Sequence, residues 1–350
     1  MGRLMRLLVI ILSAVILCLA AAFIFFMKGG NSGMKTFTNP IVTFSDTPDP
    51  WIIHKDGYYY LTFTTGANIN VWKSKSLVDW EEAKKQMVWL PPVGTEHSYD
   101  IWAPELHWIN GKWYIYFAAD DGQNPSHRMY VLESKTSDAL GEYEFKGKIA
   151  DPKHDYWAID GTVLEWDGKR YFIWSGWERE SATDLFPQNL YMAPMANPWT
   201  LGGERQLIST PEYDWEKQGA AINEGPAVLK KDGKVFLAYS ASGSWTPDYK
   251  VGLLTLEAGT DPMVRENWIK SPEPVFKRND AEGVYGPGHV SFTTSPDQEE
   301  VWMVYHATSG IHDGWDNRKA RLQKITWTED GKPEFGIPKG SETPIEVPSR

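Results

Sequence analysis

The folded part of this sequence lacks cysteine, and the chain as a whole lacks any excess of basic residues. The single cysteine among the 350 residues, Cys18, lies in an apolar N-terminal segment, so no disulfide can support the remainder. Absence of disulfides does not fix the cellular compartment. Acidic residues outnumber basic ones, 46 to 35, and the formal net charge is −11. This charge argues against nucleic acid as a partner, whereas a neutral ligand would be indifferent to it.

The sequence also lacks a long amphipathic helical pattern. Residues 77–86 form the best helix candidate, and that candidate is short. Aromatic residues, in contrast, are abundant: 18 Trp, 16 Tyr and 14 Phe make up 14% of the chain. Such residues favour strands and can also stack on sugar rings, although packing between sheets accounts for most of them. The composition indicates an all-β protein.

The first 33 residues form an export segment rather than part of the fold. Arg3 and Arg6 precede an apolar run over residues 7–27, which is long for a signal-peptide core and adequate for a membrane span of about 20 residues. Three alanines at 20–22 offer a cleavage site, yet more apolar residues follow them. We therefore expect residues 1–33 to be a signal anchor or a cleaved signal peptide, with a short linker.

A third interpretation of this segment, a lipoprotein signal at Cys18, is disfavoured because Leu17 is too large for that processing. All three interpretations export the domain formed by residues 34–350. They limit any membrane contact to the N-terminal segment and make the domain secreted or membrane-anchored outside the cytoplasm.

One sequence unit recurs five times along the rest of the chain. Each copy has an acidic residue or histidine, a short apolar run, a turn and a second apolar-aromatic run, and the clearest copy surrounds Asp232-Gly233. Apolar runs around Asp-Gly are a strong hairpin signal. The copies start roughly 55–65 residues apart, in the range of propeller blades. They are residues 49–61, 104–116, 159–174, 223–240 and 288–305. The pattern predicts a five-bladed β-propeller, with 178–188 as a rim insert in the third blade.

Each copy carries a polar residue at or next to its first position: Asp49, Glu105, Asp160, Glu224 and His289. Equivalent positions in a radial repeat converge on its axis. We therefore expect four carboxylates and a histidine to gather at one end of a central channel.

Hydrolysis of a glycosidic bond needs such carboxyl groups. One protonates the leaving oxygen, and the other activates water or attacks directly. A third can raise the pKa of the acid by like-charge repulsion. Glu224 has the reach of a proton donor, Asp49 is short and precedes Pro50, and Asp160 precedes Gly161, which permits close approach. Taken singly, each could instead be a turn or surface residue, and we expect Glu105 to have a structural or rim role.

These motifs resemble glycoside hydrolase family 43 over residues from about 39 to 340. The stretches that carry the resemblance are Asp49-Pro50, Asp100-Ile101-Trp102-Ala103-Pro104-Glu105, Ile159-Asp160-Gly161 and Asn223-Glu224-Gly225-Pro226. The family is a five-bladed propeller of inverting enzymes. The resemblance implies that Asp49 is the general base, Asp160 the pKa modulator and orienter, and Glu224 the general acid.

The same resemblance implies three binding residues. Trp102 matches the aromatic residue beside the sugar in the first subsite, and Arg318 matches, less securely, an arginine that contacts sugar hydroxyls. His289 matches a histidine at the channel centre associated with hydrated calcium. Calcium prefers oxygen ligands, so the alternative is that His289 is hydrogen-bonded in the channel wall. No organic cofactor is implied.

Within the family, the segments 318–327 and 330–338 look like those of exo-acting α-L-arabinofuranosidases. The implied substrate is α-1,5-arabinan or its oligosaccharides, from plant cell walls. A β-xylosidase or an endo-arabinanase is the alternative, and a chain end near 350 counts against the C-terminal sandwich that many family xylosidases carry.

Two other classes of protein remain alternatives. The retaining fructosyl hydrolases are also five-bladed, but their usual Arg-Asp-Pro element is missing from the middle of this chain. A non-catalytic sugar-binding or protein-binding propeller has no need for three converging carboxylates.

Overall fold

The computed structural model describes residues 2, 35–181 and 187–350. They belong to two compact units: residues 35–37 with 345–347 form part of one, and the described residues between 38 and 344, with 348–350, form the other. In the smaller unit, β1 (Thr36–Phe37) pairs antiparallel with β23 (Ile345–Glu346). The predicted apolar span, 7–27, lies outside the described residues. Within the part of the chain that is described, no helix is long and apolar enough to cross a membrane.

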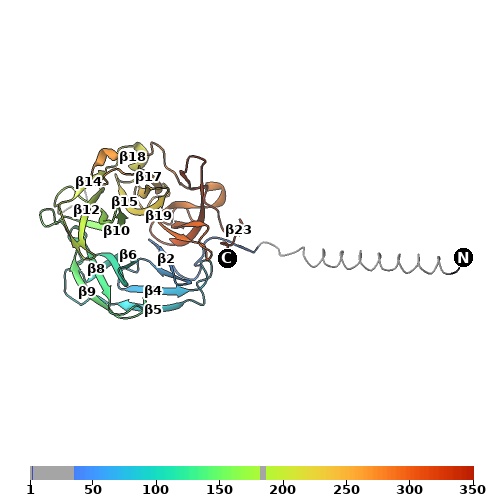
Figure 1. The fold of residues 1–350 in the computed structure, drawn as a ribbon, viewed down its shortest axis with the longest axis horizontal. Helices are drawn as coiled ribbons and strands as arrows, with labels where there is room; N and C mark the ends of the chain where they lie inside the picture. The colour runs from blue at the N-terminus through green and yellow to red at the C-terminus, as the bar shows by residue number, and fades with distance from the viewer. Residues whose placement is uncertain (1, 3–34, 182–186) are drawn as a thin grey trace. The chain divides into compact units, whose positions relative to one another are not determined.

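The larger unit is the predicted five-bladed β-propeller (Figure 1). Blade one contains β2 (Trp51–Lys55), β3 (Tyr58–Thr62), β4 (Ile69–Ser74) and β5 (Lys84–Trp89). Blade two contains β6 (Tyr99–Ile109), β7 (Lys112–Asp120), β8 (Arg128–Ser134) and β9 (Tyr143–Lys148). Blade three contains β10 (Ala158–Trp166), β11 (Lys169–Gly176), β12 (Asn189–Asn197), β13 (Thr200–Leu201) and β14 (Gln206–Ser209). Blade four contains β15 (Asn223–Lys231), β16 (Lys234–Ala241), β17 (Lys250–Leu256) and β18 (Trp268–Lys270). Blade five contains β19 (Tyr285–Thr294), β20 (Val301–Thr308), β21 (Lys319–Trp327) and β22 (Pro333–Glu334).

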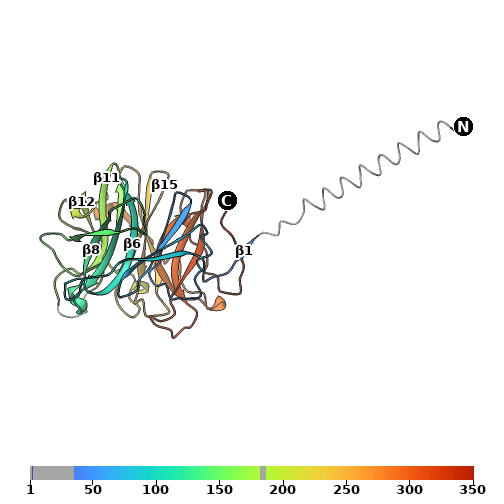
Figure 2. The same ribbon diagram turned by 90° about the horizontal axis from the view of Figure 1, so that it is seen from below.

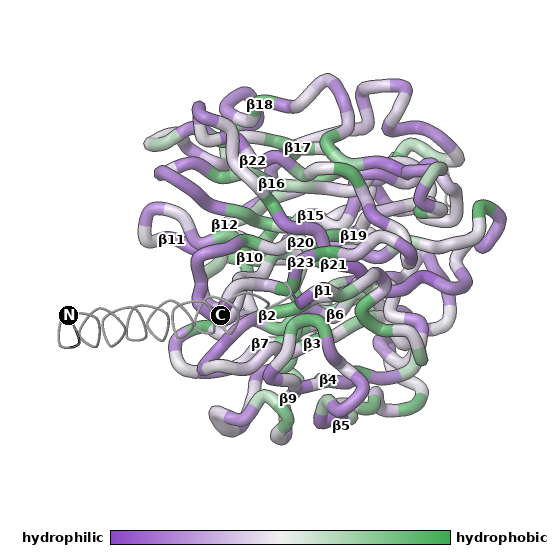
Figure 3. The backbone as a smooth tube through the Cα atoms, turned by 90° about the vertical axis from the view of Figure 1, so that its right-hand side faces the viewer, coloured by the Kyte–Doolittle hydropathy of each residue, from purple (hydrophilic) through white to green (hydrophobic). Residues whose placement is uncertain are grey.

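The first strand of each blade lies nearest the centre, and the later strands lie progressively outward (Figure 1). Seen from the side, these inner strands run through the thickness of the propeller (Figure 2). Four single-turn 3₁₀ helices occupy loops: Asn124–Ser126, Asp214–Glu216, Arg265–Asn267 and Asp280–Glu282. Hydrophobic residues recur along the strands, while the connecting loops are mainly hydrophilic (Figure 3).

The hairpin prediction is confirmed, and its physical basis is the turn chemistry. In the first four blades the two turn residues both have positive φ, as in Asp56 (51°) with Gly57 (74°) and Asp232 (49°) with Gly233 (74°). This is the backbone of a type I′ turn, which Asn-Gly and Asp-Gly sequences favour because its twist matches that of the strands. The fifth hairpin uses a longer loop between Thr294 and Val301. Turn sequence therefore sets where each inner strand ends.

Hydroxyl groups join four of the five pairs of neighbouring blades. Four of them share this role: Thr62 Oγ1 donates to Pro104 O (2.5 Å), Ser175 Oγ to Asn223 O (2.9 Å) and Ser291 Oγ to Pro50 O (3.0 Å), while Ser240 Oγ accepts from His289 N (2.7 Å). The Ser291 contact joins blade five to blade one and so closes the ring. Each bond lies within two residues of the start of a repeat, where the candidate site residues lie.

One expectation about local structure needs revision. The helix expected at 77–86 is wrong: turns at Leu77–Ala83 lead directly into β5 at Lys84. Lys84–Trp89 instead pairs with β4 as the outer strand of blade one, so sheet pairing overrides the weak helical pattern. The C-terminal tail adds β22 to blade five, and Ser349 binds Asp297 and Glu300 of the same blade. Of the predicted rim insert 178–188, residues 182–186 lie outside the described part.

Candidate active site

Each blade begins with a residue in the left-handed backbone region. The five are Asp49 (φ 54°), Ala103 (42°), Asp160 (56°), Gly225 (53°) and His289 (48°). In the last four blades this residue lies at a register shift in the inner strand, a β-bulge. Bulges redirect side chains, and positive φ is uncommon outside glycine, with Asp and His among the tolerant residues. The bulge is therefore the true repeated position around the axis.

This geometry corrects the predicted equivalence of two glutamates. Glu224 lies one residue before its bulge, in register with Trp102 and Ile159, while Gly225 occupies the position equivalent to Asp160. Glu105 lies two residues beyond the bulge of blade two. Its carboxylate contacts His107 Nε2 at 2.8 Å, a buried structural contact.

The remaining predicted polar residues do converge. His289 Nδ1 lies 3.4 Å from Asp49 Oδ1 and 4.0 Å from Asp160 Oδ2, so side chains from blades one, three and five meet. Arg318, at the start of blade five's third strand, reaches Asp49 Oδ1 with Nη1 at 3.3 Å. Glu224 lies beside the same group, since its charge and that of Asp49 both raise the pKa of Asp160.

The surroundings of Asp49 keep its carboxyl group ionised. Its Oδ2 accepts a 2.6 Å hydrogen bond from Thr64 Oγ1, and Thr64 in turn accepts the backbone N–H of Ala103. Burial raises the pKa of Asp49, but the charge of Arg318 and the two nearby histidines outweigh burial and hold that pKa well below its usual value.

His306 fixes the backbone of the same aspartate. Its Nδ1 accepts the Asp49 backbone N–H at 3.0 Å, and burial lowers the pKa of His306 to about 4. Because Nδ1 is an acceptor here, the neutral ring carries its proton on Nε2. Burial also lowers the pKa of His289. Near neutral pH, Arg318 is therefore the main positive charge that stabilises the Asp49 carboxylate.

Glu224 has the opposite electrostatic environment. Burial raises its pKa, a hydrogen bond from Tyr249 opposes the rise and the Asp49 charge adds to it, with the net result that the pKa of Glu224 is raised to about 7. That bond runs from Tyr249 OH to Glu224 Oε1 at 2.8 Å. Glu224 thus keeps a proton up to near neutral pH, while Asp49 does not.

Asp160 forms a coupled pair with Glu224. Burial and then the charges of Glu224 and Asp49 raise the pKa of Asp160 well above its usual value. Ionising two nearby buried carboxyl groups together costs electrostatic free energy, because their negative charges repel each other. The pair therefore holds a proton near neutral pH. The Gly225 N–H donates to Asp160 Oδ2 at 3.0 Å, which favours charge on Asp160. Asp160 and Glu224 therefore share one proton near neutral pH.

Trp102 lies at the edge of this cluster, next to Ala103. Its ring stacks on His127, with centroids 4.0 Å apart and planes at 24°. His127 is fully buried and its Nδ1 lies 3.1 Å from Asp120 Oδ2, so the indole rests on a rigid support. The Trp102 side chain is half-buried.

The donor set does not fit a directly bound metal ion. Across residues 35–181 and 187–350, no group of three or more His, Cys, Asp or Glu side chains is arranged to hold one. His289 instead faces the two aspartates and donates its backbone N–H to Ser240. The calcium suggested by resemblance stays an expectation.

Sequence reasoning missed three residues of the site: Thr64, Tyr249 and His306. Thr64 follows the second strand of blade one, and His306 lies near the end of the second strand of blade five. Tyr249 directly precedes the third strand of blade four. Their only sequence signal is this recurring strand-end position. What they contact depends on how neighbouring blades meet.

This cluster combines a buried carboxylate, a protonated carboxylic acid and a third carboxyl group. Such a set can perform acid–base hydrolysis of an acetal. Comparison with known proteins agrees with that chemistry. The family model described as glycosyl hydrolases family 43 matches residues 37–333.

Individual relatives are also similar. An extracellular exo-alpha-(1->5)-L-arabinofuranosidase from Streptomyces avermitilis is 42% identical over 313 residues, which span 87% of this chain and 64% of that protein. A protein of the same description from Streptomyces chartreusis is 40% identical over 276 residues, spanning 77% of this chain and 82% of that one. The crystal structure of an alpha-L-arabinofuranosidase from Lactobacillus brevis is 37% identical, with a TM-score of 0.80, and the match covers 87% of this chain and 98% of that chain. The chain thus spans less than two thirds of the Streptomyces avermitilis protein.

Proposed function

The chain belongs to glycosyl hydrolase family 43, and from that premise we propose that it releases L-arabinofuranose from α-1,5-arabinan or arabino-oligosaccharides of plant cell walls. The observation that carries the proposal is that the pKa values of two carboxyl groups in the same cluster are shifted in opposite directions. The pKa of Asp49 is held well below its usual value, and burial raises that of Glu224 to about 7. Support for the sugar comes from the arabinofuranosidases of Streptomyces avermitilis and Lactobacillus brevis, to which the chain is similar.

In this proposal Glu224 is the general acid and Asp49 the general base. Glu224 donates its proton to the glycosidic oxygen as the bond to the anomeric carbon breaks. Asp49 accepts a proton from the water that attacks the opposite face of the sugar, so the product forms with inverted configuration. Thr64 and His306 hold the base in place, and Tyr249 holds the acid.

Asp160 keeps the acid protonated. Asp160 and Glu224 share a proton, and the bond from Gly225 N–H favours the state in which Asp160 is ionised and Glu224 carries that proton; in that state the Asp160 charge resists ionisation of the glutamate. The same bond fixes the backbone immediately after Glu224. Asp160 therefore acts on both the pKa and the position of the acid.

Arg318 and Trp102 are proposed to bind the sugar whose bond is cleaved. Arg318 uses Nη1 on Asp49, and its remaining donors are suited to sugar hydroxyls. The Trp102 indole lies against His127, so its other face can stack on the ring.

The test is product analysis on α-1,5-arabinotriose, with release of 4-nitrophenol from the α-L-arabinofuranoside and β-D-xyloside as a comparison. We expect arabinose to appear first and the arabinofuranoside to be preferred. Preference for the xyloside would make the protein a β-xylosidase, and oligosaccharide products from linear arabinan would make it an endo-arabinanase. No hydrolysis of any of them would favour a sugar-binding propeller.

We also propose that the domain is exported. Two Streptomyces proteins to which it is similar are described as extracellular, and the first 33 residues have the composition of an export segment. Fractionation of the producing cells tests whether the segment is cleaved: a membrane-bound enzyme indicates an anchor, and a soluble extracellular enzyme indicates cleavage.

A further inference from the structure

Two exposed tryptophans lie on neighbouring loops of blades four and five. Trp315 is 60% exposed and Trp245 is 40% exposed, and their rings meet edge to face with centroids 5.5 Å apart and planes at 72°. We call Trp245 and Trp315 the aromatic wall. Contiguous exposed apolar surface rimmed by polar residues is a feature of ligand-binding grooves.

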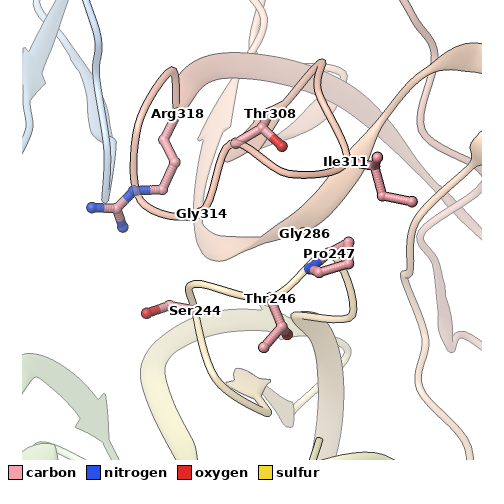
Figure 4. Close-up of a pocket in the computed structure, with 8 residues that line it drawn as sticks. All are labelled: Ser244, Thr246, Pro247, Gly286, Thr308, Ile311, Gly314 and Arg318. Atoms are coloured by element: carbon pink, nitrogen blue, oxygen red, sulfur yellow. The ribbon is translucent and has the colours of Figure 1, made fainter. Parts of the chain in front are cut away.

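The two loops that carry the wall face each other across a small recess (Figure 4). Its lining residues are Ser244, Thr246, Pro247 and Gly286 on one side and Thr308, Ile311, Gly314 and Arg318 on the other. A cross-loop hydrogen bond from Trp315 Nε1 to Ser244 Oγ, 3.0 Å long, joins the two sides.

Short-range bonds shape each loop before any ligand arrives. Thr246 N–H donates to Gly243 O at 2.9 Å, and Gly310 N–H donates to Asp313 Oδ2 at 3.0 Å. A Cβ at Gly310 would lie 2.3 Å from Asp313 Oδ1, so a larger residue there would displace the carboxylate that accepts the Gly310 N–H. Preorganised loops lose little conformational entropy on binding, which suits them to a binding role.

The aromatic wall is tied to both catalytic carboxyl groups. Arg318 donates from Nε to Trp315 O at 3.0 Å and from Nη1 to Asp49 Oδ1 at 3.3 Å. On the other loop, Trp245 lies four residues before Tyr249, which donates to Glu224. The loops that carry the wall thus lead to Arg318, which contacts Asp49, and to Tyr249, which contacts Glu224.

We propose that the aromatic wall binds the leaving sugar, and that it makes the enzyme discriminate between leaving groups that carry a ring and those that do not. This inference rests on the proposed function and deepens it. The glycosidic oxygen must lie within hydrogen-bond reach of Glu224 to receive its proton. The sugar attached through that oxygen then lies beside the loop that leads to Tyr249. Indole faces suit the C–H face of a furanose, while the net negative charge of the protein does not repel this neutral ligand.

The experiment compares two substrates with the same arabinofuranosyl group. α-1,5-Arabinobiose has a sugar as leaving group, and methyl α-L-arabinofuranoside has only methanol. The variants are Trp245→Ala and Trp315→Ala, with Phe145→Ala as the matched control, because Phe145 is an exposed aromatic residue (37%) on β9 of blade two.

Each wall variant is expected to raise KM for arabinobiose on the order of tenfold. A change of this size is expected when one apolar side chain no longer contacts the sugar. The methyl glycoside should change less than about twofold, as should both substrates with the control. Trp315→Phe should recover most of the KM, because it keeps an aromatic face while losing the N–H bond to Ser244.

Equal losses on both substrates would overturn the inference, since the loops would then serve only to position Arg318. Unchanged kinetics on arabinobiose would overturn it as well. A Trp315→Phe variant as poor as Trp315→Ala would assign the effect to the hydrogen bond rather than to stacking. Failure of the unmodified enzyme on both substrates would instead refute the proposed function, so the two failures are distinguishable.

Discussion

Replacing Tyr249 by Phe should move the alkaline limb of the pH–rate profile to higher pH. Tyr249 OH donates a 2.8 Å bond to Glu224 Oε1, and this bond opposes the rise that burial causes in the pKa of Glu224, which is about 7 with the bond in place. A hydrogen bond to an ionised group contributes roughly 1.5–3 kcal/mol. One pKa unit corresponds to about 1.4 kcal/mol, so losing the bond should raise the pKa of Glu224 by about 1–2 units.

The sign follows from the role of the group. A general acid works only while it is protonated, so activity is lost as pH rises through its pKa. Raising the pKa of Glu224 therefore extends activity to higher pH. The maximal rate should fall at the same time, because a weaker acid whose carboxyl group is no longer held by Tyr249 donates its proton less well.

The assay is kcat/KM on arabino-oligosaccharides over the full pH range, which reports the ionisation of the free enzyme. The Phe ring can keep its place against His306, where the centroids are 5.7 Å apart and the planes are nearly parallel at 8°. Tyr239→Phe is the matched control, because Tyr239 OH donates at 2.9 Å to buried Glu216 in the same blade. The two variants should lose similar stability, and only the first should shift the pH profile. An alkaline limb that stays in place or moves to lower pH in Tyr249→Phe would refute the assignment of Glu224 as the acid that Tyr249 stabilises.

Three further predictions concern the carboxyl groups. Asp160→Asn removes a negative charge beside Glu224 at nearly constant shape, so the alkaline limb should move toward acid and the thermal midpoint should stay the same or rise; a normal rate with an unmoved limb would make Asp160 structural. Glu224→Gln should keep the circular dichroism spectrum and lose roughly 10²–10⁴-fold in kcat on arabino-oligosaccharides, and near-normal turnover would show that another group is the acid. A proton NMR time course should show the first-formed arabinose with the inverted anomeric configuration, since Asp49 and Glu224 belong to different blades; retention would exclude Asp49 as a base acting through water.

The sequence determined the blade pattern because that pattern is local. Asp56-Gly57, Asp167-Gly168 and Asp232-Gly233 specify tight turns by their ability to adopt positive φ, and the apolar runs on either side then pair as hairpins. The motifs around Asp49, Asp160 and Glu224 identified the candidate carboxyl groups and the family in the same way, from short contiguous stretches.

Tertiary structure decided which positions are equivalent and what surrounds each carboxyl group. The bulge makes Gly225, not Glu224, the residue of blade four that is equivalent to Asp160 of blade three. The apolar pattern of the sequence does not show a one-residue difference of this kind. The partners of the catalytic candidates come from residues far away in the chain: His306 is 257 positions from Asp49, and Tyr249 is 25 positions from Glu224. Burial and these long-range contacts give Asp49 and Glu224 opposite pKa shifts, and both arise only when five hairpins close into one ring.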